Sequence, residues 1–102
     1  MNKIEKIIKD CFWDLDISPD EIKEIVKSKD FRKEKFLFEK ILLNSSQMLA
    51  ALQIFEKDDL RKLLEDFKVP AFNHDYIFRR KNIAEVYFLG KSLLIKELQW
   101  KV

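Results

Sequence analysis

Turn-forming and reactive side chains are scarce in this sequence of 102 residues, which has one glycine, two prolines, one cysteine and one histidine. A single glycine excludes a glycine-rich loop that cradles phosphate groups. So few turn formers also argue against a many-stranded sheet. Hydrophobic residues make up 47% of the chain, enough apolar surface to offset the entropy lost on folding. These features predict an all-α fold, a compact bundle of five to six short helices forming a single helical domain over residues 1–102.

The lone cysteine, Cys11, cannot form an internal disulfide bond, which favours a reducing compartment. No apolar run approaches the roughly 18 residues that a membrane-spanning helix needs. The first residues alternate charged with apolar side chains and lack the continuous apolar region of a signal peptide. We therefore expect a cytoplasmic protein with no membrane association.

Cys11 and His74 are the residues most open to a catalytic interpretation. Cys11 lies on an apolar helical stripe beside Phe12, which favours a buried, inert thiol over a nucleophile. His74 stands at a helix start, and no serine or cysteine can be paired with it from the sequence. No cysteine and histidine spacing suits zinc. The prediction is a protein that is not an enzyme and has no catalytic residue, metal site or cofactor.

Apolar residues recur at helical spacing in six segments. The predicted helices cover residues 2–11, 19–28, 31–43, 45–55, 57–67 and 74–89. In the tail, residues 91–102, Leu94 and Leu98 suit a helix, whereas Leu98, Trp100 and Val102 alternate as a strand would. A helix is the favoured interpretation of this tail.

Capping residues mark where several of these helices begin and end. Ser18, Pro19 and Glu21 give the clearest signal, because a hydroxyl cap precedes a proline at the first helical position and a glutamate completes a capping box. The other expected caps are Asp30, Asn44 with Gln47, and Asn73 at helix starts, and Gly90 at a helix end.

Two features predict which parts of the chain form the core. The helix over 31–43 has a wide apolar arc and should be central. The inward residues expected there are Phe31, Leu37, Phe38, Ile41 and Leu42. Phe12 and Trp13 form an aromatic pair beside a capped turn, and we expect both to be buried and to anchor the first helix.

Asp14, Asp16 and Ser18 match the opening of a calcium-binding EF-hand loop. The match then fails, because Pro19 stands where glycine makes the sharp turn and Ile25 stands where the bidentate glutamate belongs. Holding the turn before the second helix is the favoured role for these carboxylates.

Basic residues are concentrated in the last third of the chain. Residues 1–67 carry 13 lysines and arginines against 15 acidic residues, whereas residues 68–102 carry 7 against 3. The candidate partner-binding residues are Arg79, Arg80 and Lys81, with Tyr76 on the same predicted helix. Consecutive helical positions spread over about 200° of arc, so not all three cations can face one partner. A solvated face, contact with an acidic protein and contact with nucleic-acid phosphates all remain open.

A helix-turn-helix reading of residues 45–67 would make this protein a DNA-binding regulator. The turn would lie near Glu56. The helix placed in the DNA groove would then carry Asp58, Asp59, Glu65 and Asp66, which phosphates repel. Residues 45–67 are therefore poorly suited to bind DNA. The alternative function is a DNA-binding regulator that uses the basic last third of the chain.

The run Phe12-Trp13-Asp14-Leu15-Asp16, the short turn within Gln53–Leu64 and the final helix ending Tyr87-Phe88-Leu89-Gly90 resemble a small bacterial and archaeal family with an N-terminal Phe-Trp-Asp-x-Asp motif. The resemblance covers about residues 12–90. It implies an antitoxin-like partner of a nucleotidyltransferase-type toxin and brings no catalytic residues. The resulting expectation is a non-enzymatic protein-interaction module.

Overall fold

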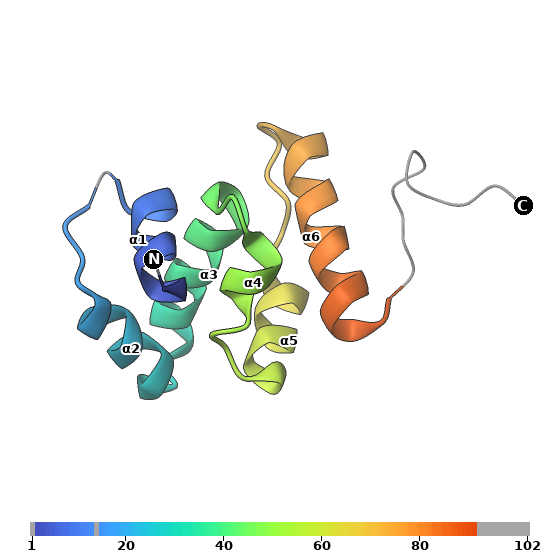
Figure 1. The fold of residues 1–102 in the computed structure, drawn as a ribbon. Coiled ribbons are helices and arrows are strands. Elements are labelled where there is room, and N and C mark those ends of the chain that lie inside the picture. Colours follow the sequence, from blue (N-terminus) through green and yellow to red (C-terminus); the bar gives the residue numbers. More distant parts are fainter. Residues whose placement is uncertain (1, 14, 92–102) are drawn as a thin grey trace, which may run out of the picture.

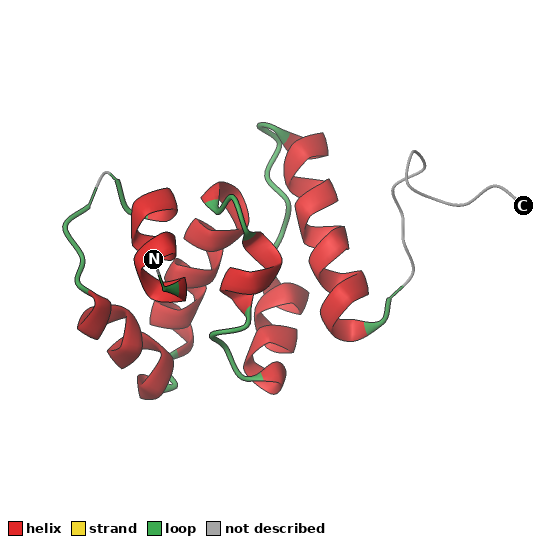
Figure 2. Ribbon diagram, in the orientation of Figure 1, coloured by secondary structure: helices red, strands yellow, loops and turns green. Residues whose placement is uncertain are grey.

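The computed structural model describes residues 2–13 and 15–91. Six helices form in this part of the chain: α1 (Lys3–Cys11), α2 (Pro19–Ser28), α3 (Phe31–Asn44), α4 (Met48–Leu52), α5 (Lys57–Asp66) and α6 (His74–Leu89). The two described ranges contain no strand (Figure 2). The predicted all-α bundle is therefore confirmed. The expectation for the tail, residues 91–102, falls outside the described residues from position 92 onward.

Helix α3 is the centre of the bundle and packs against each of the other five helices (Figure 1). Leu37, Phe38, Ile41 and Leu42 are fully buried along it. A helix at the centre needs apolar residues on more than one side, which explains the wide arc in its sequence. Phe31 differs from its prediction, because it lies in the first turn of α3 and remains partly exposed.

The predicted caps at Ser18, Asp30 and Gly90 are confirmed. The Ser18 hydroxyl accepts from the Glu21 N–H at 3.2 Å, and the Glu21 carboxylate accepts from the Ser18 N–H at 3.2 Å. Asp30 accepts from the Arg32 N–H at 3.0 Å. Gly90 ends α6 with a φ of 67°, a left-handed conformation that glycine adopts without steric cost.

The predicted cap at Asn44 is wrong. Asn44 is the last residue of α3, and its side-chain amide donates to the Lys40 carbonyl at 3.2 Å. Helix α4 begins later, at Met48, and Gln47 caps it without a side-chain hydrogen bond. Asn73 does stand at the N-cap of α6, but it takes a left-handed φ of 49° and its side chain caps nothing.

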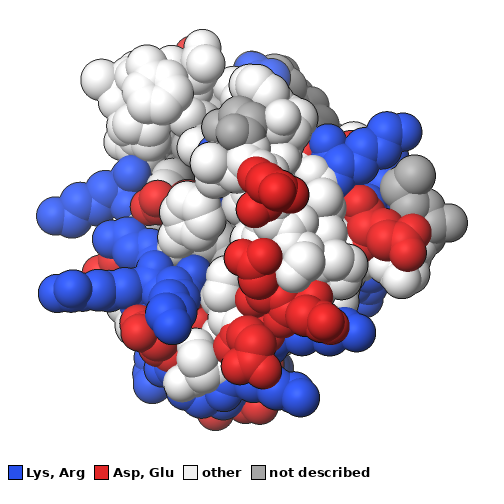
Figure 3. Space-filling view, turned by 90° about the vertical axis from the view of Figure 1, so that its left-hand side faces the viewer, with Lys and Arg blue, Asp and Glu red and all other residues white. Residues whose placement is uncertain are grey.

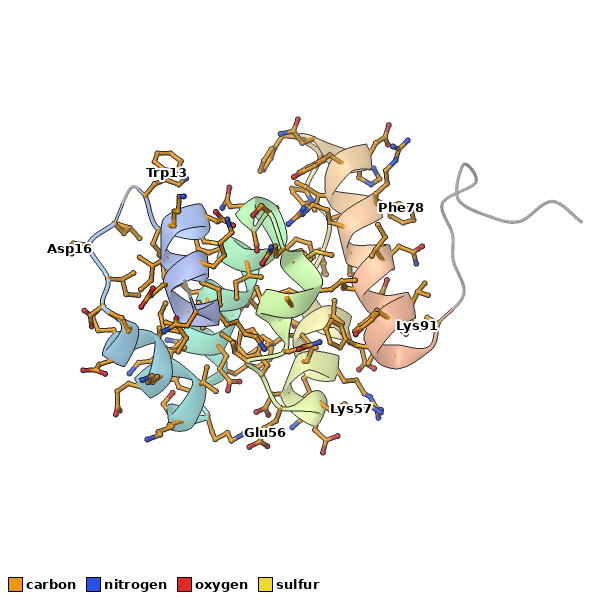
Figure 4. The ribbon with its side chains drawn as sticks, in the orientation of Figure 1. Trp13, Asp16, Glu56, Lys57, Phe78 and Lys91 are labelled. Carbon is orange, nitrogen blue, oxygen red and sulfur yellow. The ribbon has the colours of Figure 1, made fainter. Side chains whose placement is uncertain are left out.

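Phe12 and Trp13 have opposite environments, which corrects the expectation that both are buried. Phe12 is 2% exposed, and its ring lies 5.9 Å from that of Phe36. Trp13 is 76% exposed and points away from the bundle (Figure 4). The chain leaves α1 at Phe12, so the apolar stripe of that helix no longer dictates where Trp13 points.

Candidate functional site

The four candidate binding residues of α6 occupy different environments. Tyr76 is 52% exposed and Arg79 is exposed, whereas Arg80 and Lys81 are half-buried. Four positions within six residues turn around more than one face of a helix, so the structure does not gather them into one patch. Tyr76 and Arg79 remain candidates for contact with a partner.

Arg80 bonds to the carboxyl end of α3, although the sequence predicted an exposed side chain. Its Nη2 donates to the Ser45 carbonyl at 2.6 Å and to the Ile41 carbonyl at 3.4 Å, and its Nε donates to the Leu42 carbonyl. The last carbonyls of a helix lack intrahelical donors and carry partial negative charge. Since α3 has no basic residue in its own last turn, a cation from α6 satisfies this end.

Tyr76 is coupled to this arrangement through its ring. The Arg80 guanidinium carbon lies 5.5 Å from the centre of the Tyr76 ring, within the range of a cation–π contact. Because Arg80 is held by backbone carbonyls, it gives the partly exposed Tyr76 ring a fixed neighbour. A ring with such a neighbour loses less side-chain entropy on binding than a ring without contacts.

Two further basic residues of the last third pair with one nearby carboxylate. Lys81 and Lys91 each place Nζ at 3.5 Å from the same oxygen of Glu85. Lys68 is exposed, and Lys96 and Lys101 lie outside the described residues. The local excess of positive charge is therefore smaller on the described surface than the sequence count indicates.

The groups weighed for catalysis lie apart in the fold. His74 is exposed, stacks on Phe78 with ring centres 6.1 Å apart and lies 3.5 Å from the Asp75 carboxylate. Cys11 is fully buried, as predicted, and burial raises the pKa of its thiol to about 11. A thiol with that pKa is protonated at neutral pH and is a poor nucleophile.

The aspartates weighed for calcium binding are only partly within the structure. Asp14 lies outside the described residues, and Asp16 is exposed on the loop between α1 and α2 (Figure 4). Ser18 uses its hydroxyl as the cap of α2. In residues 2–13 and 15–91, no three histidine, cysteine or acidic side chains are grouped so that they could hold a metal ion.

An apolar groove between α2 and α3 is the feature that the sequence analysis missed. It has a volume of about 660 Å³, and its apolar lining comes from Ile17, Ile25 and Phe36. Phe36 remains substantially exposed there although it contacts Phe12. The excess of apolar residues on α3 was the available signal, but helical periodicity alone does not tell which of several apolar faces lacks a covering element.

A scan against protein-family models, a search of curated proteins and a search of solved structures give no match for this chain. None of the helices in the described part combines the length and the apolar character needed to cross a bilayer.

Proposed function

We propose that this protein is a non-catalytic protein-interaction module that binds its partner through the start of α6. The observation that carries the proposal is the exposure of Phe72 (64%) and Tyr76 (52%) at that end of the helix. Arg79 lies one turn further on and is also exposed. Tyrosine and arginine are enriched among the residues that dominate binding energy at protein interfaces.

The sequence resemblance supplies the expected partner, a nucleotidyltransferase-type toxin. An acidic surface on that partner would complement Arg79 and accept the exposed Tyr76 ring. Opposite charges across an interface raise the association rate and fix the register of the complex. The proposed role is therefore that of an antitoxin-like protein that works by covering a surface of the toxin.

The test is co-purification with the product of the neighbouring gene, both proteins being expressed together. We expect a stable complex with the unaltered chain and at least a tenfold loss of affinity for Tyr76→Ala combined with Arg79→Glu. Tyr87→Ala is the matched control, since Tyr87 is an exposed tyrosine at the other end of the same helix. Equal retention of the partner by the double variant and the control would refute the α6 surface.

A DNA-binding regulator is less well supported than a protein-binding module. Arg80 is bonded to the end of α3, and Lys81 and Lys91 share a carboxylate, so these cations are already engaged within the fold. Helix α5 carries Asp58 and Asp59 in its first turn, where a helix placed in a DNA groove approaches the bases and phosphates. The salt dependence of DNA binding distinguishes the two functions, because the affinity of a regulator that contacts many phosphates falls steeply as salt rises.

A further inference from the structure

The two sides of the α2–α3 groove carry opposite charge. Asp20 and Glu24 line the groove from α2, and Arg32 and Lys33 line it from α3. Figure 3 looks onto the side of the molecule that carries α1 and α2, and it shows acidic side chains gathered in a band with basic side chains massed beside them. In residues 2–13 and 15–91, no ion pair involves any of these four side chains.

Two exposed apolar side chains, Trp13 and Leu15, lie on the loop that joins α1 to α2. This loop begins at Phe12, which contacts Phe36, and leads to Ile17, which lines the groove. An apolar groove rimmed by charged residues is typical of a protein-binding site rather than of ordinary solvated surface.

We propose that a second copy of this chain docks on this surface. A two-fold axis parallel to the groove places the α2 wall of each copy opposite the α3 wall of the other. The acidic pair of each copy then faces the basic pair of the other, so this contact occurs twice in the dimer, and the apolar linings face each other. A two-fold axis perpendicular to the groove would bring walls of like charge together. The charge pattern therefore selects the first arrangement.

Charge complementarity favours a second copy over an unrelated protein as the occupant. An unrelated partner would need an apolar stripe with basic groups on one edge and acidic groups on the other, at the spacing of these walls. A second copy has both walls by construction. Helix α6 lies at the other end of the molecule from α2 (Figure 1), so this dimer leaves the surface of the proposed function open.

The experiment compares two charge-reversed chains, alone and mixed. The first carries Asp20→Lys with Glu24→Lys, which makes both walls basic. The second carries Arg32→Glu with Lys33→Glu, which makes both walls acidic. Sedimentation velocity over a concentration series should show dimers for the unaltered full-length chain, at least tenfold weaker self-association for each variant alone, and restored dimers when the two variants are mixed.

Matched controls separate this effect from a change in net charge or in folding. Asp58→Lys with Glu65→Lys, and Arg61→Glu with Lys62→Glu, reverse the same number of exposed charges on α5. Both control chains should dimerise like the unaltered protein. Thermal melts followed by circular dichroism identify any variant that has lost its fold, and mixing provides a second readout because a misfolded chain cannot be rescued by its counterpart.

The remaining outcomes contradict the proposal. A chain that stays monomeric at every concentration leaves the groove for an unrelated partner. Association that survives both reversals places the contact elsewhere, including on residues 92–102. Neither result affects the proposed function, which is tested on Tyr76 and Arg79 at α6.

Discussion

The Arg80 guanidinium joins the middle of α6 to the end of α3, and its removal takes a charged donor away from the Leu42 and Ser45 carbonyls. Hydrogen bonds from a charged group contribute about 1.5–3 kcal/mol. We expect Arg80→Ala to lower the free energy of unfolding by about that amount, measured by urea denaturation. Arg61→Ala, at an exposed position of α5, should stay within about 0.5 kcal/mol. If Arg80→Ala and Arg61→Ala lower the free energy of unfolding by the same small amount, Arg80 is dispensable for the fold.

Glu34 is a buried carboxyl group on α3 and is only 3% exposed. Its Oε1 has no hydrogen-bond partner among the residues that the structure describes. Burial first, and the charge of Asp59 second, raise the pKa of Glu34 above its ordinary value of 4.5. Lys29 opposes this shift while it bonds to Asp59 at 2.7 Å and to Glu56 at 2.9 Å.

This raised pKa predicts how stability depends on pH. Between the ordinary pKa and the raised one, the folded protein keeps a proton that the unfolded chain has released. The contribution of Glu34 to the free energy of unfolding is therefore greatest at low pH and falls as pH rises through this range. Glu34→Gln should remove that fall in urea titrations between about pH 4 and about pH 8. The exposed Glu65→Gln is the control, and an unchanged slope in Glu34→Gln would contradict the prediction.

Asp10 connects two elements, because it lies on α1 and accepts from Ser46 in the connection between α3 and α4. The Ser46 hydroxyl donates at 2.6 Å and the Ser46 N–H at 3.0 Å. These bonds lower the pKa of Asp10, the hydroxyl having the larger effect. A lowered pKa gives stability that is present above the ordinary value of 3.8 and is lost as pH falls through the folded value.

Ser46→Ala tests this link between elements. We expect it to reduce the free energy of unfolding by about 1–2 kcal/mol at neutral pH and by much less in acid, where Asp10 is protonated in both proteins. Ser46→Thr keeps a hydroxyl and should restore most of the loss. If Ser46→Ala lowers the free energy of unfolding by the same amount at neutral and at acid pH, Asp10 is not involved.

The end of α1 offers a paired test of burial. Phe12→Ala should cost about 3–5 kcal/mol, because it removes a buried ring from the core. Trp13→Ala should cost less than about 1 kcal/mol, because the ring is already in solvent. Both are measured by urea denaturation. A large loss on removing Trp13 would place its ring in the core.

The elements that the sequence predicted correctly are those whose signals are local. The Ser18 cap and its Glu21 partner are three residues apart, and apolar periodicity was enough to place α3 at the centre. Arg80 and the end of α3 are 35 to 39 residues apart in sequence, so no local pattern joins them. Trp13 was misplaced for a related reason, since its exposure depends on where the chain turns after α1. Which apolar face stays uncovered is likewise decided only by tertiary packing.

The molecule as a whole has a net charge of +2, and its charges are distributed so that opposite signs stand close together. Lys29 joins two carboxylates, Lys81 and Lys91 share a third, and the groove walls oppose each other. Over residues 2–13 and 15–91, such alternation of sign weakens the long-range attraction of nucleic acid. It favours short-range recognition of a patterned protein surface.

Salt dependence of DNA binding tests this view of the whole molecule. Each phosphate contact makes the affinity fall by roughly one log unit per tenfold rise in salt. With Arg80, Lys81 and Lys91 engaged within the fold, we expect few contacts and non-specific binding weaker than about 1 µM at physiological salt. Gel-shift titrations at several salt concentrations measure both quantities, with a scrambled duplex as the control. Specific regulators reach dissociation constants of about 1 nM. Sequence-selective binding at that level would support the DNA-binding regulator over the protein-binding module.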